Sequence, residues 1–200
     1  ELKEDNQIPE LEKKYKWLVI NTGLFYRYSS KLIIQNKPKK IIPFLKKKFK
    51  NIKYKNIANQ KLFSEEISMN VGYLAKKKKV REIINHNIKN IIKNNKRICL
   101  EGRDIASKIL NKRPKYDVAF YFKCNLKIAS KRRWLELKKI PKLSDVKKSL
   151  KKRTLLDKNR INSPLKKVKD AFLIRTDQLN KSQVLNKMSY IIDKKLKSKN

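Results

Sequence analysis

Short apolar segments alternate with longer amphipathic ones along this chain, and this alternation restricts the folds that it can adopt. Between the short segments, apolar side chains recur at three- and four-residue steps, which is the spacing of one helix face. Because strands that alternate with helices build a parallel sheet through right-handed crossovers, we predict an α/β fold whose parallel sheet has helices on both faces. The four segments expected as strands are residues 17–20, 98–100, 117–124 and 170–176.

Two kinds of local signal place the helices. Asn180 and Gln183 match a capping box for the last helix, and Ser144 stands where another helix would have its N-cap. The lysine-rich residues 37–61 contain two prolines and predict an irregular loop with at most a short strand or helix. The expected helices are residues 24–34, 64–95 (two helices joined around 76–79), 125–140 and 144–160.

The size and hydropathy of the chain indicate one cytoplasmic domain. Its 200 residues, 40% of them hydrophobic, are enough to bury a core. No apolar run approaches the roughly 18 residues that suggest a membrane span, and the start shows no signal-peptide pattern. We therefore expect no membrane partner. Because Glu1 rather than Met opens the sequence, we expect a fragment or a processed chain.

Few side chains are available for metal binding or for nucleophilic catalysis. Cys99 and Cys124 lie in strand-like runs without CxxC spacing, which favours two buried reduced thiols over a disulfide or a metal site. The single histidine, His86, is expected on a helix surface. A zinc site and a Ser-His-Asp triad are therefore excluded, and no metal ligand is identified.

The net charge of +38 is the feature that most suggests a nucleic-acid partner. However, the excess is mostly lysine spread along the chain, with heavy use of Asn and Ile, as an AT-rich coding bias would produce. We therefore favour a solvated lysine-rich surface. Arginine is different, because its planar fork suits bidentate phosphate contacts. Arginines beside acids, such as Arg103 beside Asp104, indicate a small phosphorylated ligand.

Polar turns follow the first two predicted strands. Asn21-Thr22-Gly23 comes directly after residues 17–20, and Glu101-Gly102-Arg103-Asp104 comes after residues 98–100. Parallel sheets bind ligands beyond the carboxyl ends of their strands, so we expect a binding site at these turns. An ordinary turn with a local ion pair explains the second segment equally well when it is taken alone.

Taken together, these segments resemble the bacterial cytidylate kinases, whose motifs they match in order over nearly the whole chain. The resemblance implies a P-loop nucleoside monophosphate kinase fold in a single domain. It implies a core of residues 9–35, 96–140 and 168–200, a nucleotide-side insertion at about 36–95 and a lid at about 141–167. The matching segments are NTGLFYR (21–27), SEEISMNVGYLAKKKKVREII (64–84), EGRDIAS (101–107), ASKRRWLEL (129–137), RTLLDKNRINSPL (153–165) and DAFLIRT (170–176).

The resemblance also implies the reaction and the residues that perform it. A monomeric enzyme would transfer a phosphoryl group from ATP to CMP or dCMP, with Mg²⁺ carried by the nucleotide and no nucleic-acid partner. Such transfer depends on positioning and charge neutralisation, for which arginines are suited. Thr22, Arg27 and Arg103 would bind the CMP phosphate, Arg81 and Asp104 the cytosine ring, and Asp157 the ribose. Arg153 and Arg160, on one helix face, would bind the transferred phosphates. Arg132 and Arg133 would lie on the ATP side, and Arg132 would be catalytic together with Arg153 and Arg160.

The chain departs from the family pattern at its start and in two turns. The family begins with a strand and a Gly-x-x-x-x-Gly-Lys-[Ser/Thr] loop that cradles the donor phosphates. Residues 1–10, where this loop would fall, contain no glycine. We expect either a truncated or frameshifted start or a lost donor site, with impaired catalysis. Asn21 replaces the usual acid of the first turn, and Gly72 stands near the position where the family has a serine that contacts the base.

Two other functions remain open. One is a relative that binds CMP or a similar nucleotide without transferring phosphate. The other is a basic nucleic-acid-binding protein, which the charge suggests but the motifs do not. Such a protein should expose aromatic side chains among basic ones on a strand face, whereas the aromatic residues here mostly fall in predicted core positions.

Overall fold

The computed structural model describes residues 8–112 and 114–198. The chain divides into two compact units. One is the 18–105 unit, and the other, called here the terminal unit, combines residues 1–17 with 106–200. Each unit contains a pair of parallel strands and its own helices.

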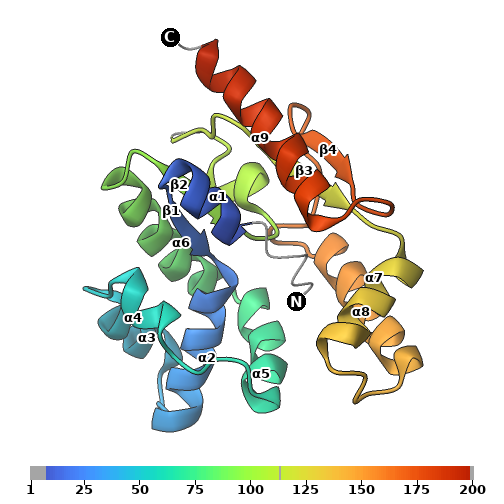
Figure 1. Ribbon diagram of the computed structural model, residues 1–200. Helices are drawn as coiled ribbons and strands as arrows, with labels where there is room; N and C mark the ends of the chain where they lie inside the picture. Colours follow the sequence, from blue (N-terminus) through green and yellow to red (C-terminus); the bar gives the residue numbers. More distant parts are fainter. Residues whose placement is uncertain (1–7, 113, 199–200) are drawn as a thin grey trace. The chain divides into compact units, whose positions relative to one another are not determined.

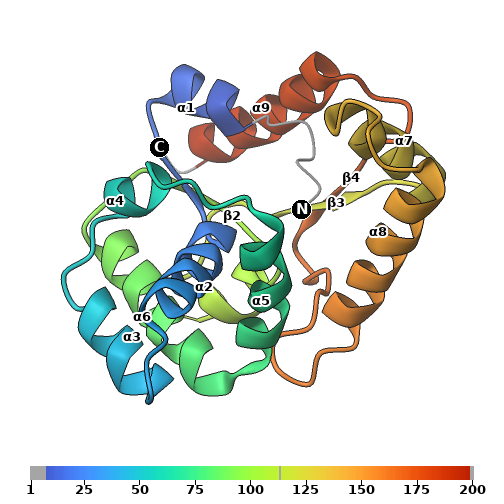
Figure 2. The same cartoon turned by 90° about the horizontal axis from the view of Figure 1, so that it is seen from below.

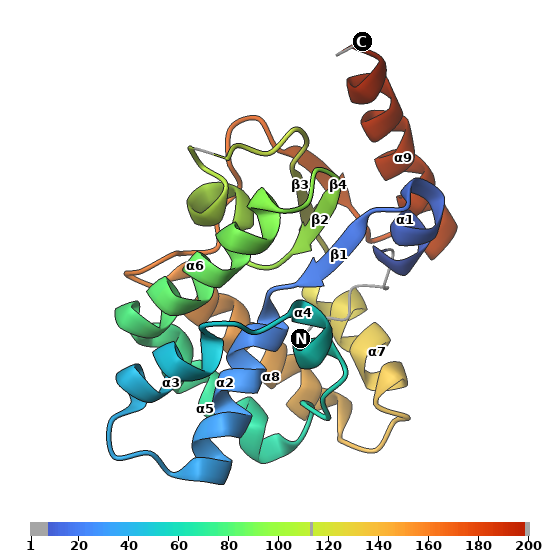
Figure 3. The ribbon, with the colours of Figure 1, turned by 90° about the vertical axis from the view of Figure 1, so that its left-hand side faces the viewer.

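The 18–105 unit is built on two parallel strands, which lie side by side in Figure 3. Asn21 pairs with Glu101 at the end of the ladder, so the two strands finish level with each other. The elements of this unit are β1 (Leu18–Asn21), α2 (Gly23–Asn36), α3 (Ile41–Phe49), α4 (Tyr54–Ala58), α5 (Glu65–Lys76), α6 (Lys78–Lys93) and β2 (Ile98–Glu101).

A dense apolar core holds this unit together. Helix α6 has Val80, Ile84 and Ile88 on one face, at the four-residue steps of an amphipathic helix, and all three are fully buried. Phe25 of α2 is equally buried and stacks with Phe49 of α3 at 6.3 Å between ring centroids. The core therefore fixes α2 and α6, which carry side chains toward the ends of β1 and β2.

The terminal unit has the second parallel strand pair and most of the remaining helices. Figure 2 shows α1 beside α9 and α7 beside α8. Between α7 and α8, Ala129, Val146 and Leu150 form a small buried cluster against Trp134. The elements are α1 (Ile8–Tyr15), the π-helical turn η1 (Ile105–Ile109), which straddles the boundary between the units, β3 (Phe120–Lys123), α7 (Leu126–Glu136), α8 (Leu143–Lys158), β4 (Phe172–Arg175) and α9 (Lys181–Lys197).

The predicted α/β class and the parallel direction of the strands are confirmed. The strands pair as β1–β2 and β3–β4, however, and within the described residues no ladder joins the pairs into one sheet. The two helices expected over residues 64–95 are present, as is the capping box of Asn180 and Gln183. Residues 37–61, predicted as mostly irregular, contain the two helices α3 and α4.

Three details of the predicted helices are wrong. Ser144 is not an N-cap, because α8 begins earlier, at Leu143, after an extended Lys142 whose carbonyl accepts from Asp145 N at 3.0 Å. The same helix ends at Lys158, so Arg160 follows the helix instead of sharing its face with Arg153. Helix α7 stops at Glu136, well before residue 140, because the next residues include left-handed Lys138 and Lys139. Backbone conformations of this kind leave no periodic signal in the sequence.

Candidate nucleotide site

The turns after β1 and β2 are bonded directly to each other. Thr22 donates from its backbone N and from Oγ1 to the carbonyl of Glu101, at 2.9 and 2.8 Å. Asn21 Nδ2 donates to Glu101 Oε2 at 3.0 Å, and Asn21 Oδ1 accepts from Gly23 N at 2.9 Å. The amide at position 21 thus fits this turn as the donor that a carboxylate could not supply.

Gly102 is required where the two turns approach each other. A Cβ atom built on Gly102 would lie 2.3 Å from Thr22 Oγ1 and 2.8 Å from Ile105 Cδ1. Any side chain would therefore push the β2 turn away from Thr22. This close packing explains the glycine in Glu101-Gly102-Arg103-Asp104. It also fixes the backbone position of the half-buried Arg103, which follows in the same turn.

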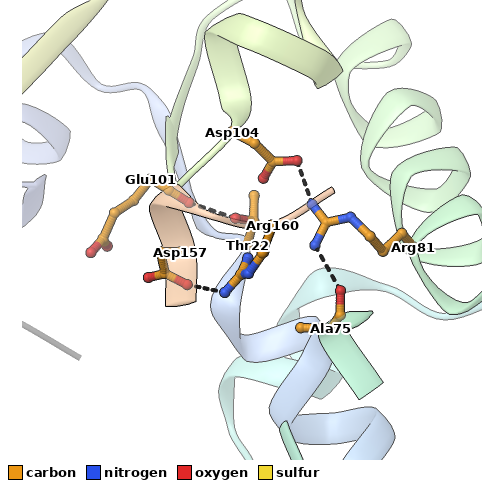
Figure 4. A network of polar contacts seen from close by, with 7 residues as sticks. All are labelled: Thr22, Ala75, Arg81, Glu101, Asp104, Asp157 and Arg160. Carbon is orange, nitrogen blue, oxygen red and sulfur yellow. Dashed lines mark hydrogen bonds and ion pairs between the residues drawn. The ribbon is translucent and has the colours of Figure 1, made fainter. Parts of the chain in front are cut away.

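Arg81 and Asp104 form a buried ion pair close to these turns. Their side chains are 5% and 9% exposed, and Arg81 Nη2 donates to Asp104 Oδ2. Arg81 Nη1 also donates to the carbonyl of Ala75 at 3.2 Å, and the guanidinium lies 5.6 Å from the Tyr26 ring centroid. Figure 4 shows these bonds with the Thr22–Glu101 contact.

One polar atom of this pair is left without a hydrogen bond. Arg81 Nε is buried and has no partner among the described residues. Burying a guanidinium N–H without an acceptor costs free energy, and such an atom is what a ligand acceptor would satisfy. The pair therefore combines a fixed carboxylate with a donor that is still available.

Arg27 of α2 is also buried, and it bonds to the loop that precedes α5 and to α5 itself. Its Nη1 donates to the carbonyl of Leu62 at 3.2 Å and to Ser68 Oγ at 2.9 Å, and its guanidinium lies 4.7 Å from the Phe63 ring centroid. On the following helix, a Cβ atom added to Gly72 would meet no other atom within 4 Å. A serine would therefore fit at this position, and the glycine is not demanded by packing.

In the terminal unit, a second buried aspartate is paired with arginines. Asp157 is 1% exposed in its side chain, and Arg160 Nη2 donates to its Oδ1. Arg153 Nε lies 3.8 Å from Asp157 Oδ2. The structure thus brings together all three residues expected in the lid, although Arg160 reaches Asp157 from beyond the helix.

Arg132 and Arg133 contact the chain itself. Arg132 Nη2 donates to the carbonyls of Thr176 and Leu179, at 2.8 and 3.1 Å, and so fixes the turn between β4 and α9. Arg133 Nη1 pairs with Glu136 Oε2 at 2.9 Å. These contacts engage part of each guanidinium in holding local structure.

Residues that could hold a metal ion are not grouped in the described part of the chain, where no three His, Cys, Asp or Glu side chains come together. His86 is exposed on α6, as expected. Cys99 and Cys124 are free and half-buried. Burial, together with the charge of nearby Glu101, raises the pKa of the Cys99 thiol to about 11, which keeps it protonated at neutral pH. No described helix has the length and apolarity to cross a membrane.

Sequence reasoning missed several partners of the predicted residues. These partners are the Glu101 carbonyl, Ser68, the Tyr26 ring and the Tyr54 hydroxyl. The Tyr54 hydroxyl accepts from Asn21 N at 2.8 Å. Ser68 could have been found, because it lies one turn after the N-cap Ser64 on a helix that faces Arg27. The others act through a backbone carbonyl, a ring face or a single distant hydroxyl, and leave no motif.

A parallel-strand α/β fold with polar turns at two adjacent strand ends and a buried Arg81–Asp104 pair beside them has the architecture of the ligand-binding α/β class of proteins. Comparison with known families makes this specific. The sequence model of the family described as "Cytidylate kinase" matches residues 9–194, nearly the whole chain. The chain therefore belongs to the cytidylate kinase family, with its P-loop nucleoside monophosphate kinase fold.

Three relatives show how far the similarity extends. The chain is 32% identical to a cytidylate kinase of Clostridium botulinum (strain Hall) over 90% of this chain and 88% of that protein. It is 25% identical to a cytidylate kinase of Mesomycoplasma hyopneumoniae (strain 7448), over 94% and 87%. It is 30% identical to a bifunctional pantoate ligase/cytidylate kinase of Prochlorococcus marinus (strain NATL2A), of which it spans only 39%.

Proposed function

We propose that this chain binds CMP or dCMP as the acceptor for a phosphoryl group from ATP, the reaction that yields CDP or dCDP. The observation that carries the proposal is the buried Arg81–Asp104 pair beside the bonded turns of β1 and β2, in a chain of the cytidylate kinase family. A fixed carboxylate with an unsatisfied guanidinium N–H close by is suited to reading the edge of a base.

Asp104 would distinguish cytosine from uracil. A carboxylate accepts hydrogen bonds, and the exocyclic amine of cytosine is a donor that uracil lacks. The carbonyl of uracil at the same position would face the carboxylate as a second acceptor. Arg81 positions Asp104 through their ion pair and offers Nε to an acceptor on the base.

The phosphate of the acceptor nucleotide would be bound by Arg27 and Arg103, with Thr22 at the start of α2. Arginine is the strongest candidate because its planar fork can meet two phosphate oxygens at once. Thr22 donates both its backbone N–H and its Oγ1–H to the Glu101 carbonyl, so its contribution would be to fix the turn that leads into α2 and not to donate to the phosphate.

The cluster around Asp157 would act as the lid. Arg153 and Arg160 are half-buried and share one carboxylate. They can therefore turn toward a negatively charged ligand while Asp157 stays in place or binds the ribose. Arg132 and Arg133 would lie on the ATP side, where a guanidinium that also holds the β4–α9 turn supplies a fixed positive charge.

The donor side does not fit ATP on these 200 residues alone. Their three glycines are Gly23, Gly72 and Gly102, and none belongs to a Gly-x-x-x-x-Gly-Lys sequence. The place expected for that loop, residues 1–10, falls largely outside the described residues. Without a phosphate cradle, we propose that these residues by themselves transfer phosphate slowly. Mg²⁺ would be carried by the nucleotide.

A second function follows from the same glycine count: a nucleotide-binding relative that transfers no phosphate. Measuring CMP binding and phosphoryl transfer on the same protein separates the two functions, because only the kinase would do both. Nucleic-acid binding is supported only by the charge of +38 and by no grouping of residues around the site.

The test of the site is a calorimetric titration of the 200-residue chain with CMP and with UMP at the same ionic strength. We expect CMP to bind at least about tenfold more tightly, because UMP would leave Asp104 facing an acceptor. The total charges of the two ligands are equal, so nonspecific attraction to the lysines affects both alike. Equal affinities would contradict the assignment of Asp104.

A further inference from the structure

Strand β4 has an open edge. It pairs with β3 on one side only, and none of the described residues forms a ladder along its other side. The hydrogen bonds to β3 show which residues of β4 direct their backbone N–H and C=O groups toward β3. Phe172 N donates to the Ala119 carbonyl at 2.8 Å, and Thr176 N donates to the Lys123 carbonyl at 2.9 Å.

Because backbone groups alternate along a strand, Leu173 and Arg175 direct their N–H and C=O groups away from β3. The open edge therefore presents two donors and two acceptors at the spacing of a further strand. Unpaired edges of this kind are templates for another extended chain.

Beside this edge, β4 and α9 enclose a groove of about 640 Å³. Figure 1 shows α9 lying along β4. Apolar side chains are exposed here, with Leu173 at 45% and Tyr190 at 70%. The groove is lined by Leu173, Ile174, Arg175, Asn186, Lys187, Tyr190 and Ile191.

The charge of the groove lining indicates which kind of ligand would bind there. It contains two cations, Arg175 and Lys187, and no acidic residue. A second copy of the chain, paired edge to edge, would bring its own Arg175 to this already cationic edge and would add another net charge of +38. An extended segment with acidic side chains meets the two cations favourably and can place an apolar side chain against Leu173 and Tyr190.

We propose that the β4–α9 groove is a docking site for an extended acidic peptide segment, which adds a strand to β4 and places an apolar residue beside Tyr190. Backbone bonds to Leu173 and Arg175 would give affinity for any extended chain. The cations and the apolar lining would give selectivity for alternating acidic and apolar side chains.

The probe for this site is a short fluorescein-labelled peptide of alternating glutamate and valine, titrated with the 200-residue chain by anisotropy at physiological salt. Two control peptides separate docking from simple attraction to a basic protein. One has alternate amides N-methylated along one edge, which preserves its charge but prevents strand pairing. The other has lysine in place of glutamate. We expect only the first peptide to bind measurably.

Variants of the groove test each contribution. Leu173→Pro removes an outward N–H while leaving the N–H groups that bond to β3, and Leu173→Ala removes the side chain alone. We expect Leu173→Pro to weaken binding about tenfold more than Leu173→Ala. Charge reversal by Arg175→Glu with Lys187→Glu should abolish binding of the acidic peptide and permit binding of the lysine peptide. Lys147→Glu with Lys148→Glu on α8, exposed residues outside the groove, is the control with the same change of charge.

The outcomes are distinct. Equal binding of the N-methylated peptide, or equal losses from the groove and α8 charge reversals, would show attraction by net charge only and overturn the proposal. Absence of binding by the first peptide would do the same. Self-association of the chain that Leu173→Pro abolishes would make a second copy the occupant instead. If Leu173→Pro does not fold by circular dichroism, the charge-reversal pair still decides the matter.

Discussion

Two aspartates are buried in the described part of the chain, and arginines hold them in different ways. In the 18–105 unit, Asp104 and Arg81 are both buried, with side chains 9% and 5% exposed. In the terminal unit, Asp157 is 1% exposed, but its partners Arg160 and Arg153 are 22% and 37% exposed. The first pair is part of the fold, whereas the second consists of a fixed acid with two arginines that reach water.

This difference indicates a division of work. A fully buried pair cannot rearrange without leaving a charge uncompensated, so it suits the recognition of one base shape. Half-exposed arginines around a fixed acid can exchange one anion for another at small cost, so they suit a part that closes on phosphate. The comparison therefore predicts that acceptor binding and phosphoryl transfer can be separated in this chain.

The largest expected effect is on turnover. In a coupled assay with ATP and CMP, we expect the 200-residue chain to have a kcat lower by on the order of a thousandfold than that of the Clostridium botulinum relative. The physical reason is the absence of a glycine-lysine phosphate cradle in these residues. CMP binding by calorimetry should persist in the same preparation. Normal turnover would show that the arginines of the terminal unit suffice on the donor side.

The next effect is on stability. Arg81→Leu should lower the free energy of unfolding by about 3–5 kcal/mol in urea titrations, because it removes a guanidinium that pairs with the buried Asp104 carboxylate. Adding Asp104→Leu should restore much of the loss. Arg160→Leu serves as the comparison, since its partly exposed partnership should cost clearly less. Equal losses at Arg81 and Arg160 would remove the distinction between a fixed pair and a mobile one.

A third effect concerns Arg103, the residue next to Asp104 of the buried pair. Arg103→Ala should weaken CMP binding by about 1.5–3 kcal/mol, because a bidentate charge-assisted contact to phosphate is lost. Lys96→Ala, an exposed lysine nearby in sequence, is the control. The Arg103 loss should persist at high salt while the lysine effect fades, and Arg103→Lys should restore only part of it. If the two alanine variants behave alike at both salt concentrations, Arg103 belongs to a turn and not to a site.

The sequence predicted the parts of the molecule that depend on local patterns. Residues 98–104 indicate a strand end with opposed charges, and the parallel pairing of β1 with β2 follows from the alternation of strands and helices. The partner of Asp104 in the fold was not predictable in the same way. Arg81, 23 residues earlier in the sequence, makes an ion pair with Asp104 because α6 brings it to the strand ends.

Other features depend on tertiary contacts that no local pattern encodes. The bonds from Arg132 to two backbone carbonyls could not be predicted, because backbone acceptors have no residue type; its place on the ATP side stays a prediction. The helices α3 and α4 form in a lysine-rich segment because Leu45, Phe49 and Ile57 are buried there. The open edge of β4 is also invisible in sequence, since it depends on which neighbour the strand lacks.

The smallest effect is expected at Arg153, and it tests the mobile side of the comparison. Its Nε lies 3.8 Å from Asp157 Oδ2, and the side chain is more than a third exposed, so Arg153→Ala should change the free energy of unfolding by only about 0–1 kcal/mol. Lys152→Ala, at the adjacent exposed position on α8, is the matched control.

The sharper readout for Arg153 is ligand binding. If Arg153 closes on phosphate, its alanine variant should weaken the binding of CDP more than that of cytidine, while the lysine variant leaves the ratio unchanged. An ion-pair ladder on a helix surface that contacts no ligand would affect the binding of neither. An unchanged ratio of CDP to cytidine affinity in Arg153→Ala would therefore show that the Asp157 cluster is a local structural contact. Of the two buried pairs, the Arg81–Asp104 pair would then be the only one that recognises a ligand.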